Sequence, residues 1–195
     1  MLRAAPVKLL CDTPREWVEL AALRFDEVLV DHAHCEKKAA AQALSLLSAF
    51  PQAPGLARAM ARMAREEAGH LAQVLALMER RGLTLGRDAG DPYAQGLQEQ
   101  VRQPAQERLL DRLLVSALIE MRSEERLRLL GQRLPDADLR RFYARLALAE
   151  AGHGELFLRL ARKSAPLDVV EERAAALLRV EARLVRELPV RAAIH

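Results

Sequence analysis

The tetrapeptide Glu-Ala-Gly-His occurs twice, at residues 67–70 and again at residues 150–153. Each copy lies within a long stretch in which apolar residues recur at helical spacing. Residues three positions apart lie on one face of a helix, so the glutamate and the histidine of each copy point the same way. The repeat therefore predicts two helices that each present a carboxylate and an imidazole to one side.

A single glutamate precedes each copy on another stretch of helical periodicity. Glu36 lies 31 residues before Glu67, and Glu120 lies 30 residues before Glu150. Four carboxylates and two imidazoles from four helices are the ligands of carboxylate-bridged di-iron or di-manganese sites in helix bundles. We therefore expect a metal centre with six ligands, which are Glu36, Glu67, His70, Glu120, Glu150 and His153.

Other polar residues compete with Glu36 on its own helix. Asp31, His32 and His34 all lie within one and a half turns of it. We favour Glu36 as the ligand because its distance to Glu67 mirrors the interval in the second half of the chain. His32 is four positions from Glu36 and is expected to bind that carboxylate rather than the metal. Asp31 and His34 are expected to face solvent or a neighbouring helix.

Glu120 has competitors as well. Glu124 lies one turn further along the same helical face, so it stays open as an additional ligand. Glu125 points in another direction and is expected to pair with an arginine. Glu120 is preferred because it keeps the symmetric interval to Glu150.

The alternative to a metal centre is a set of polar residues on exposed helix faces. A lone Glu-x-x-His commonly has that origin, but two copies at matching places, flanked by apolar residues, indicate a position facing the core. Burying an unpaired carboxylate costs several kcal/mol, so four converging carboxylates require a cation. Carboxylate and imidazole ligands without thiolate suit iron, with manganese as the less favoured metal.

Gly69 and Gly152 occupy equivalent positions within the two tetrapeptides. A glycine inside a helix costs about 1 kcal/mol relative to alanine. We expect that cost to reflect a close approach between helices or space for a ligand. Simple accommodation of packing is the alternative.

Helical periodicity runs through the chain and alternating strand patterns do not, which predicts an all-α fold. Thr13 is expected to cap the first helix, with Pro14 as its first residue and Glu16 completing a capping box. This helix would reach about residue 49, and a break near Leu20 stays open. Asp136 or Asp138 would cap one later helix, and Asp168 with Glu171 another. The later helices are expected over residues 56–81, 92–101, 107–133, 137–163 and 168–188.

Composition sets the broad class. The 195 residues predict one domain over residues 1–195, and 51% hydrophobic with 29% charged residues is typical of amphipathic helices. No apolar run approaches the ~18 residues of a membrane span, and residues 1–11 do not resemble a signal peptide. We therefore expect a cytoplasmic protein with Cys11 and Cys35 as free thiols. The net charge of +3 permits an anionic partner such as RNA without demonstrating one.

Several stretches together resemble the MiaE-type tRNA hydroxylases, which are ferritin-like di-iron proteins. Val-Asp-His-Ala-His-Cys-Glu-Lys-Lys-Ala-Ala at residues 30–40 carries most of the resemblance. Thr13-Pro14 followed by Trp17, Met-Ala-Arg-Glu-Glu at residues 63–67, and Ile-Glu-x-Arg-Ser-x-Glu-Arg at residues 119–126 add to it. The similarity spans residues 9–185. The chain departs from the family pattern at two places. Glu124 stands where a smaller uncharged residue is expected, and Ala-Gly forms the middle of both tetrapeptides, where bulkier residues are more usual.

The resemblance implies a ferritin-like four-helix bundle with a long crossover connection and an additional C-terminal helix. It implies a non-haem di-iron monooxygenase that hydroxylates the isopentenyl group of 2-methylthio-N6-isopentenyl adenosine beside the tRNA anticodon. Such a reaction uses O2 and two electrons, which an electron-donating reductase would supply. The ligand set that it implies is the same six residues given above.

Binding of tRNA is expected to rest on phosphate contacts, with one base extruded into a pocket. The candidate basic residues are Lys37, Lys38, Arg65, Arg122, Arg126, Arg140, Arg141 and Arg145. Three other functions use similar helices and stay open as alternatives. They are a ferritin-type iron oxidase or storage protein, a manganese catalase or rubrerythrin-like peroxidase, and a metal-free interaction module.

Overall fold

The computed structural model describes residues 6–195, apart from the side chain of residue 106. These residues form seven α-helices joined by turns and loops. In chain order they are α1 (Arg15–Leu23), α2 (Phe25–Ala49), α3 (Leu56–Arg80), α4 (Pro92–Gln98), α5 (Ala105–Arg133), α6 (Ala137–Ser164) and α7 (Leu167–Glu187).

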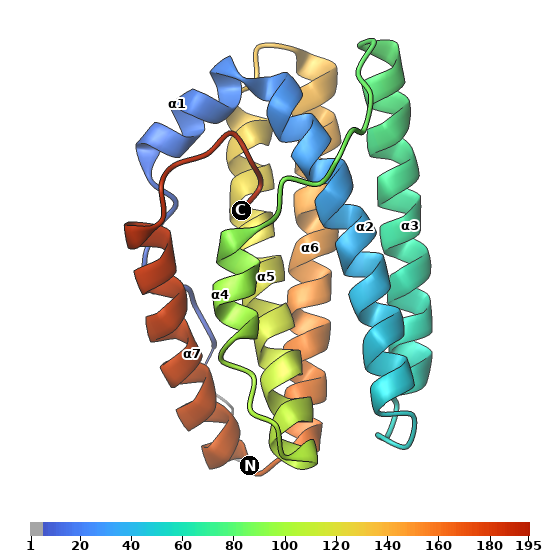
Figure 1. Ribbon diagram of the computed structural model, residues 1–195, viewed down its shortest axis with the longest axis vertical. Coiled ribbons are helices and arrows are strands. Elements are labelled where there is room, and N and C mark those ends of the chain that lie inside the picture. Colours follow the sequence, from blue (N-terminus) through green and yellow to red (C-terminus); the bar gives the residue numbers. More distant parts are fainter. Residues whose placement is uncertain (1–5) are drawn as a thin grey trace.

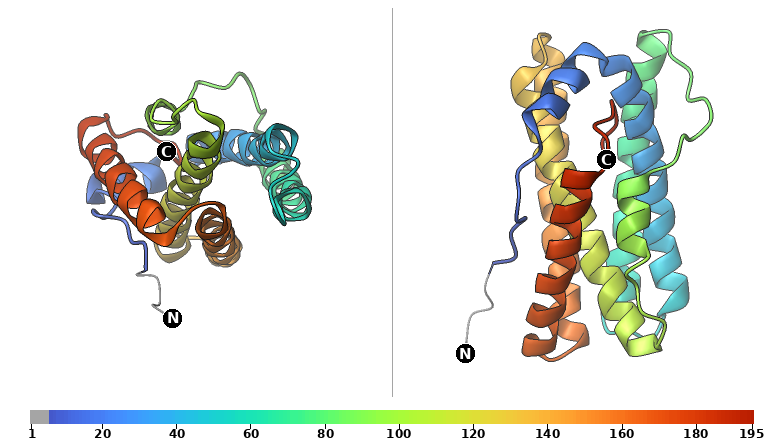
Figure 2. Two further views of the ribbon diagram at one scale, coloured as in Figure 1. Left: turned by 90° about the horizontal axis from the view of Figure 1, so that it is seen from below. Right: turned by 60° about the vertical axis from the view of Figure 1, so that its left-hand side comes forward.

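Four long helices make the bundle. The α2–α3 hairpin and the α5–α6 hairpin stand side by side, and α1 lies across one end (Figure 1). The connection from α3 to α5 passes over α2 and carries the short helix α4, while α7 packs against α5 (Figure 2). The prediction of a ferritin-like bundle with a long crossover and an additional C-terminal helix is confirmed.

The start of the chain differs from its prediction. Pro14, not Thr13, stands at the N-cap of α1, and the break before α2 falls at Arg24 rather than near Leu20. The backbone N–H of Thr13 donates to the Glu125 carboxylate at 3.1 Å and its hydroxyl donates at 2.5 Å. The capping prediction was wrong because a carboxylate distant in sequence binds the hydroxyl that would have capped the helix.

Of the two other predicted helix N-caps, one is confirmed and one was wrong. Asp136 caps α6 by accepting hydrogen bonds from the backbone N–H groups of Asp138 and Leu139 at 2.7 and 3.1 Å, as one of the two expected choices. The expected cap by Asp168 was wrong, because α7 begins at Leu167 and its N-cap is Pro166. A proline that presets the backbone angle already suffices to start that helix.

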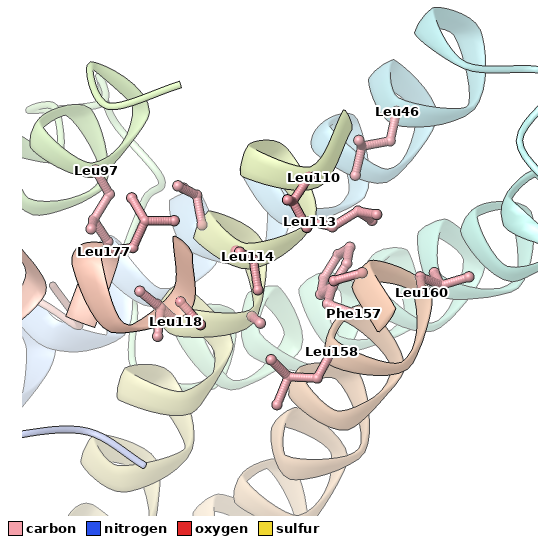
Figure 3. Close-up of a cluster of buried hydrophobic side chains, with 14 of the residues drawn as sticks. Leu46, Leu97, Leu110, Leu113, Leu114, Leu118, Phe157, Leu158, Leu160 and Leu177 are labelled. Atoms are coloured by element: carbon pink, nitrogen blue, oxygen red, sulfur yellow. The ribbon is translucent and has the colours of Figure 1, made fainter. Parts of the chain in front are cut away.

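The core consists of two apolar clusters at different heights of the bundle. One includes Leu46, Leu113 and Phe157 and is drawn in Figure 3. The other includes Leu29 and Leu130. Full burial of each such side chain contributes about 1.5–3 kcal/mol, so both clusters hold the four long helices together. The two Glu-Ala-Gly-His segments lie on these helices between the clusters.

Gly69 and Gly152 are exposed, and a Cβ built on either would meet no atom within 4 Å in the described part of the chain. The expectation of a close helix approach at these two positions was therefore wrong. A close approach between helices occurs instead at Gly131 on α5, where a Cβ would lie 3.1 Å from the backbone nitrogen of Ala144 on α6.

Between residues 6 and 195, no helix is both long enough and apolar enough to cross a membrane. The first five residues of the N-terminal segment considered above lie outside the described residues.

An ion-pair cluster ties the crossover segment and α7 to α5. The side chain of Asp111 is fully buried, and its carboxylate accepts hydrogen bonds from the guanidinium groups of Arg102 and Arg173, each at 2.8 Å. Burial raises the pKa of Asp111, but the hydrogen bonds from the two arginines outweigh it and lower this pKa below its usual value. A carboxyl with a lowered pKa stabilises the fold above its unfolded pKa.

We expect Asp111→Asn to reduce the free energy of unfolding by about 3 kcal/mol at pH 7, because the two arginines lose their anionic partner. In the parent protein this contribution is lost as the pH falls from about 4 through the lower pKa of the folded state. Urea unfolding followed by circular dichroism at pH 7 and at pH 3 measures both effects. The matched control is Asp138→Asn, which removes an exposed pair with Arg141. Equal losses in the two variants would contradict the prediction.

Candidate metal centre

The fold brings the six predicted residues together from four helices. Two groups of potential metal ligands result, and within each group the donor atoms lie within 4.8 Å of one another. The first group consists of Glu36, Glu67, His70 and Glu150, and the second of Glu67, Glu120, Glu150 and His153. Glu67 and Glu150 belong to both groups. The arrangement therefore offers two cation positions with two carboxylates able to bridge them.

The spacing within each tetrapeptide sets the local geometry. The His70 Nδ1 atom lies 3.3 Å from a Glu67 oxygen, and the His153 Nδ1 atom lies 3.2 Å from a Glu150 oxygen. These are i,i+3 neighbours on one helical face. The two imidazole centroids are 5.8 Å apart, so the two hairpins present their histidines to a common space.

Contacts between helices complete the centre. The Nδ1 atom of His153 on α6 lies 2.8 Å from the Glu67 carboxylate on α3, and the Nδ1 atom of His70 lies 3.6 Å from Glu36 on α2. Glu67 is fully buried, and Glu120 and Glu150 are 6% and 3% exposed. Water therefore has little access to the charges at this level of the bundle.

The buried charges perturb one another strongly. Burial and the neighbouring carboxylate of Glu150 raise the pKa of Glu120 well above its usual value. Burial also tends to raise the pKa of Glu67, but the adjacent imidazoles of His153 and His70 outweigh it and lower this pKa to about 2. Burial tends to lower the histidine pKa values, yet hydrogen bonds to the carboxylates raise them to about 10 for His70 and about 11 for His153.

One oxygen indicates that the residues fit a metal. The buried Oε1 atom of Glu67 has no hydrogen-bond partner among the described residues, although His153 Nδ1 is 2.8 Å away. An unsatisfied buried carboxylate oxygen carries a large desolvation cost. A cation between Glu67 and Glu150 would satisfy this oxygen and would offset the repulsion that raises the pKa of Glu120. Oxygen and imidazole donors without thiolate suit iron or manganese.

His32 supports the centre from outside it, as expected. Its Nε2 atom is 2.7 Å from the Glu36 carboxylate, and its Nδ1 atom is 3.3 Å from the Tyr143 hydroxyl. All three side chains are buried. This chain of contacts holds the Glu36 carboxylate in one orientation.

The competing residues of α2 lie elsewhere. Asp31 accepts a hydrogen bond from the Ile194 backbone N–H at 2.6 Å, and the Nε2 atom of His34 is 3.2 Å from the Leu85 carbonyl. Both contacts are with segments outside the helices, whereas solvent or a neighbouring helix was expected.

The competing glutamates of α5 also turn away from the centre. Glu124 faces Arg128 at 3.4 Å and belongs to none of the three groups of potential metal ligands found in the described chain. Glu125 pairs with Arg122, which confirms the prediction that it binds an arginine.

A cavity of about 390 Å³ adjoins the carboxylates and reaches the crossover segment. Glu36, Glu67, Glu120 and Glu150 form one part of its wall. Apolar residues that line it are Ala39, Ile119, Leu127, Phe157 and Ile194. A cavity of this kind can hold an organic group of modest size against the carboxylate cluster.

The last residues of the chain form another part of the wall, which the sequence did not predict. The Ala193 carbonyl accepts a hydrogen bond from Trp17 Nε1 at 2.8 Å, and the Ile194 carbonyl accepts one from Arg126 at 2.6 Å. The His195 imidazole lies 3.1 Å from Asp91 and 2.9 Å from the Ser123 hydroxyl. Each of these contacts joins positions far apart in sequence, so periodicity carries no signal for them.

Two of the basic residues proposed to contact tRNA are buried. Arg122 binds Glu181 on α7, and Arg126 stacks over Trp17 with its guanidinium carbon 4.9 Å from the ring centroid. Their expected role in phosphate binding was wrong, because these arginines hold α1, α5 and α7 together. The other candidates that are exposed are Lys37, Arg65, Arg141 and Arg145.

Comparisons with known proteins agree on one family. The whole chain, residues 1–195, matches the family described as tRNA-(MS(2)IO(6)A)-hydroxylase (MiaE). A protein of Pseudomonas putida named tRNA 2-(methylsulfanyl)-N(6)-isopentenyladenosine(37) hydroxylase is 44% identical over 151 residues, which cover 77% of this chain and 73% of that protein. A protein of the same name from Salmonella typhimurium is 29% identical over 208 residues, covering 82% and 77% of the two chains.

A solved structure resembles the fold closely. It is described as protein 43 with aldehyde deformylating oxygenase activity from Synechococcus. The TM-score is 0.92 and the sequence identity is 38%, and the alignment covers 96% of this chain and 94% of that one. The arrangement of helices therefore occurs in a protein to which an oxygenase activity is ascribed.

We expect Glu67→Ala to lose both metal ions, because this carboxylate belongs to both ligand groups. His153→Ala removes a ligand from one group and should retain about one ion per chain. Metal content is measured by elemental analysis after iron loading and desalting, and circular dichroism checks that both variants stay helical.

Glu79→Ala is the control for metal content, because it removes an exposed carboxylate from the same helix as Glu67. It should bind as much iron as the parent protein. Unchanged iron content in Glu67→Ala would exclude the six residues as the metal site.

Proposed function

The chain belongs to the MiaE family of tRNA hydroxylases, and from this premise we propose that it hydroxylates the isopentenyl group of 2-methylthio-N6-isopentenyl adenosine beside the anticodon. The protein is an oxidoreductase that acts on modified tRNA. The main support for the proposal is that the two overlapping groups of potential metal ligands adjoin a largely apolar cavity.

We propose that the six residues Glu36, Glu67, His70, Glu120, Glu150 and His153 hold two iron ions. When bound, such a pair supplies the activation of O2 and the oxidation of a carbon–hydrogen bond. The reaction adds one oxygen atom to the substrate and reduces the other to water, which consumes two electrons and two protons. An electron-donating reductase is therefore a required partner.

The protein's own contribution is positioning and the exclusion of water. Ile119 and Phe157 line the cavity and would pack against the isopentenyl chain, so that a methyl group faces the carboxylates. His32 and Tyr143 keep the Glu36 carboxylate in place through contacts of 2.7 and 3.3 Å. The apolar part of the wall would also limit the access of water and of competing reductants to the reacting centre.

The substrate must reach this cavity from a folded RNA. Burial of the carboxylates means that the modified base has to leave the anticodon stack, as in enzymes that extrude their target nucleotide. The exposed cations Lys37, Arg65 and Arg145 are candidates for contacts with phosphates, which position the RNA without reading its sequence.

Iron storage and peroxidase activity are the rival functions, since similar ligands serve them. The cavity argues for an organic substrate, because neither storage of iron nor reduction of peroxide needs an apolar chamber of about 390 Å³ beside the ligands. The aldehyde activity ascribed to the Synechococcus protein makes a long-chain aldehyde a necessary comparison substrate.

We expect iron-loaded protein, supplied with O2 and a reductase system, to convert the modified adenosine of tRNA to its hydroxylated form. Nucleoside mass spectrometry detects the added oxygen, and 18O2 establishes its source. Glu67→Ala should reduce turnover by at least about a hundredfold, because removal of a ligand from both groups abolishes the centre. Glu79→Ala should retain full activity.

Parallel reactions contain hydrogen peroxide alone or a long-chain aldehyde. Rapid peroxide decomposition or aldehyde conversion without tRNA hydroxylation, under a proven electron supply, would contradict the proposal. Assembly into a large shell of many subunits would favour iron storage.

A further inference from the structure

Besides Glu67 Oε1, three buried polar atoms of residues that line the cavity lack hydrogen-bond partners within residues 6–195. They are the ammonium nitrogen of Lys38, the amide nitrogen of Gln42 and the hydroxyl oxygen of Ser116. Leaving a buried donor unsatisfied costs about 1–3 kcal/mol. Three such atoms on the wall of one cavity indicate that a ligand with hydrogen-bond acceptors satisfies them.

The contacts of Gln42 and Lys38 leave the N–H groups of both side chains available to a ligand in the cavity. The amide oxygen of Gln42 accepts a hydrogen bond from Arg112 at 3.2 Å, so its nitrogen is the end that remains available. The Lys38 nitrogen is 3.7 Å from Asp88 and 3.9 Å from Asp91. Both distances exceed that of a hydrogen bond, so the two carboxylates balance the charge of Lys38 without using its N–H groups.

Ser116 is unusual for a serine within a helix. Such a hydroxyl commonly bonds the carbonyl four residues earlier. The Ser116 side chain is only 4% exposed, and its hydroxyl makes no such bond in the described structure. Its hydroxyl is therefore a buried polar group without a structural role in α5.

The three donors are displaced from the candidate metal centre along the bundle. Ser116 precedes Glu120 by one turn, about 6 Å at the rise of an α-helix. Gln42 follows Glu36 by six residues, about 9 Å, and Ala39 lines the cavity between them. A ligand that reaches the carboxylates with an apolar chain therefore presents the group attached to that chain to these donors.

We propose that Lys38, Gln42 and Ser116 form a subsite for the purine ring of the substrate, donating hydrogen bonds to its ring nitrogens. The inference rests on the proposed function and extends it to the recognition of the base. Glutamine side chains are common partners of adenine edges. A phosphate is the less suitable occupant, because two of the three donors are neutral and phosphate sites favour several cations or bidentate arginine.

The test compares two small ligands that share the prenyl group. N6-isopentenyladenosine carries the ring nitrogens, whereas N-isopentenylaniline has the same prenylated amine on a ring without them. Isothermal titration calorimetry with the iron-loaded protein measures both affinities. We expect the parent protein to prefer the adenosine by about a hundredfold, since each of the three hydrogen bonds contributes about fivefold. In the double variant Gln42→Leu, Ser116→Ala the ratio should fall to about fivefold, because only the Lys38 donor remains.

The matched control is the double variant Gln132→Leu, Ser48→Ala, which changes exposed residues on the same two helices. It should keep the preference of the parent protein. The subsite is overturned if the parent protein shows no preference, or if Gln42→Leu, Ser116→Ala retains the preference of the parent protein. Displacement of the nucleoside from the parent protein, but not from this variant, by inorganic phosphate would also overturn it.

Turnover on modified tRNA is measured separately to distinguish the two claims. If the parent protein hydroxylates tRNA and the cavity variant keeps the full ligand preference, only the subsite is wrong. If hydroxylation fails under a proven electron supply while the variant's preference falls as expected, the proposed function is wrong and the purine subsite stands.

Discussion

The structure depends on the burial of four carboxylates at one level of a helix bundle. Apolar clusters above and below this level hold the helices in place, with Leu29 and Leu130 in one cluster and Leu46 and Phe157 in the other. Desolvation of the carboxylates and the repulsion among them oppose this packing, as the raised pKa of Glu120 indicates. A polar layer of this kind is stable only with positive charge inside it, and protonated histidines or metal cations can supply that charge.

The same layer determines where a substrate can bind. The cavity shares its wall with the carboxylates, and the short helix α4 and the last residues of the chain complete that wall. Arg126 and Trp17 donate hydrogen bonds to the carbonyl oxygens of Ile194 and Ala193, and so hold the end of the chain in place. The crossover and the C-terminal segment therefore complete the cavity that adjoins the carboxylate layer of the bundle.

The arginines illustrate how one residue type serves different physical roles in this protein. Arg122 is fully buried and joins α5 to α7 through Glu181, whereas Arg65 and Arg145 are exposed. A buried guanidinium must be paired because of its desolvation cost. Only the exposed cations can contact RNA, so fewer basic residues are available for RNA binding than the sequence contains.

The sequence by itself determined the four long helices and the convergence of the six predicted residues. Helical periodicity and the repeated Glu-Ala-Gly-His segments are local patterns, and i,i+3 spacing fixes how Glu67 and His70 lie relative to each other. Tertiary structure alone decided that Thr13 binds Glu125 and that the C-terminal segment lines the cavity. These outcomes depend on contacts between residues far apart in the chain, for which neither periodicity nor capping preference carries information.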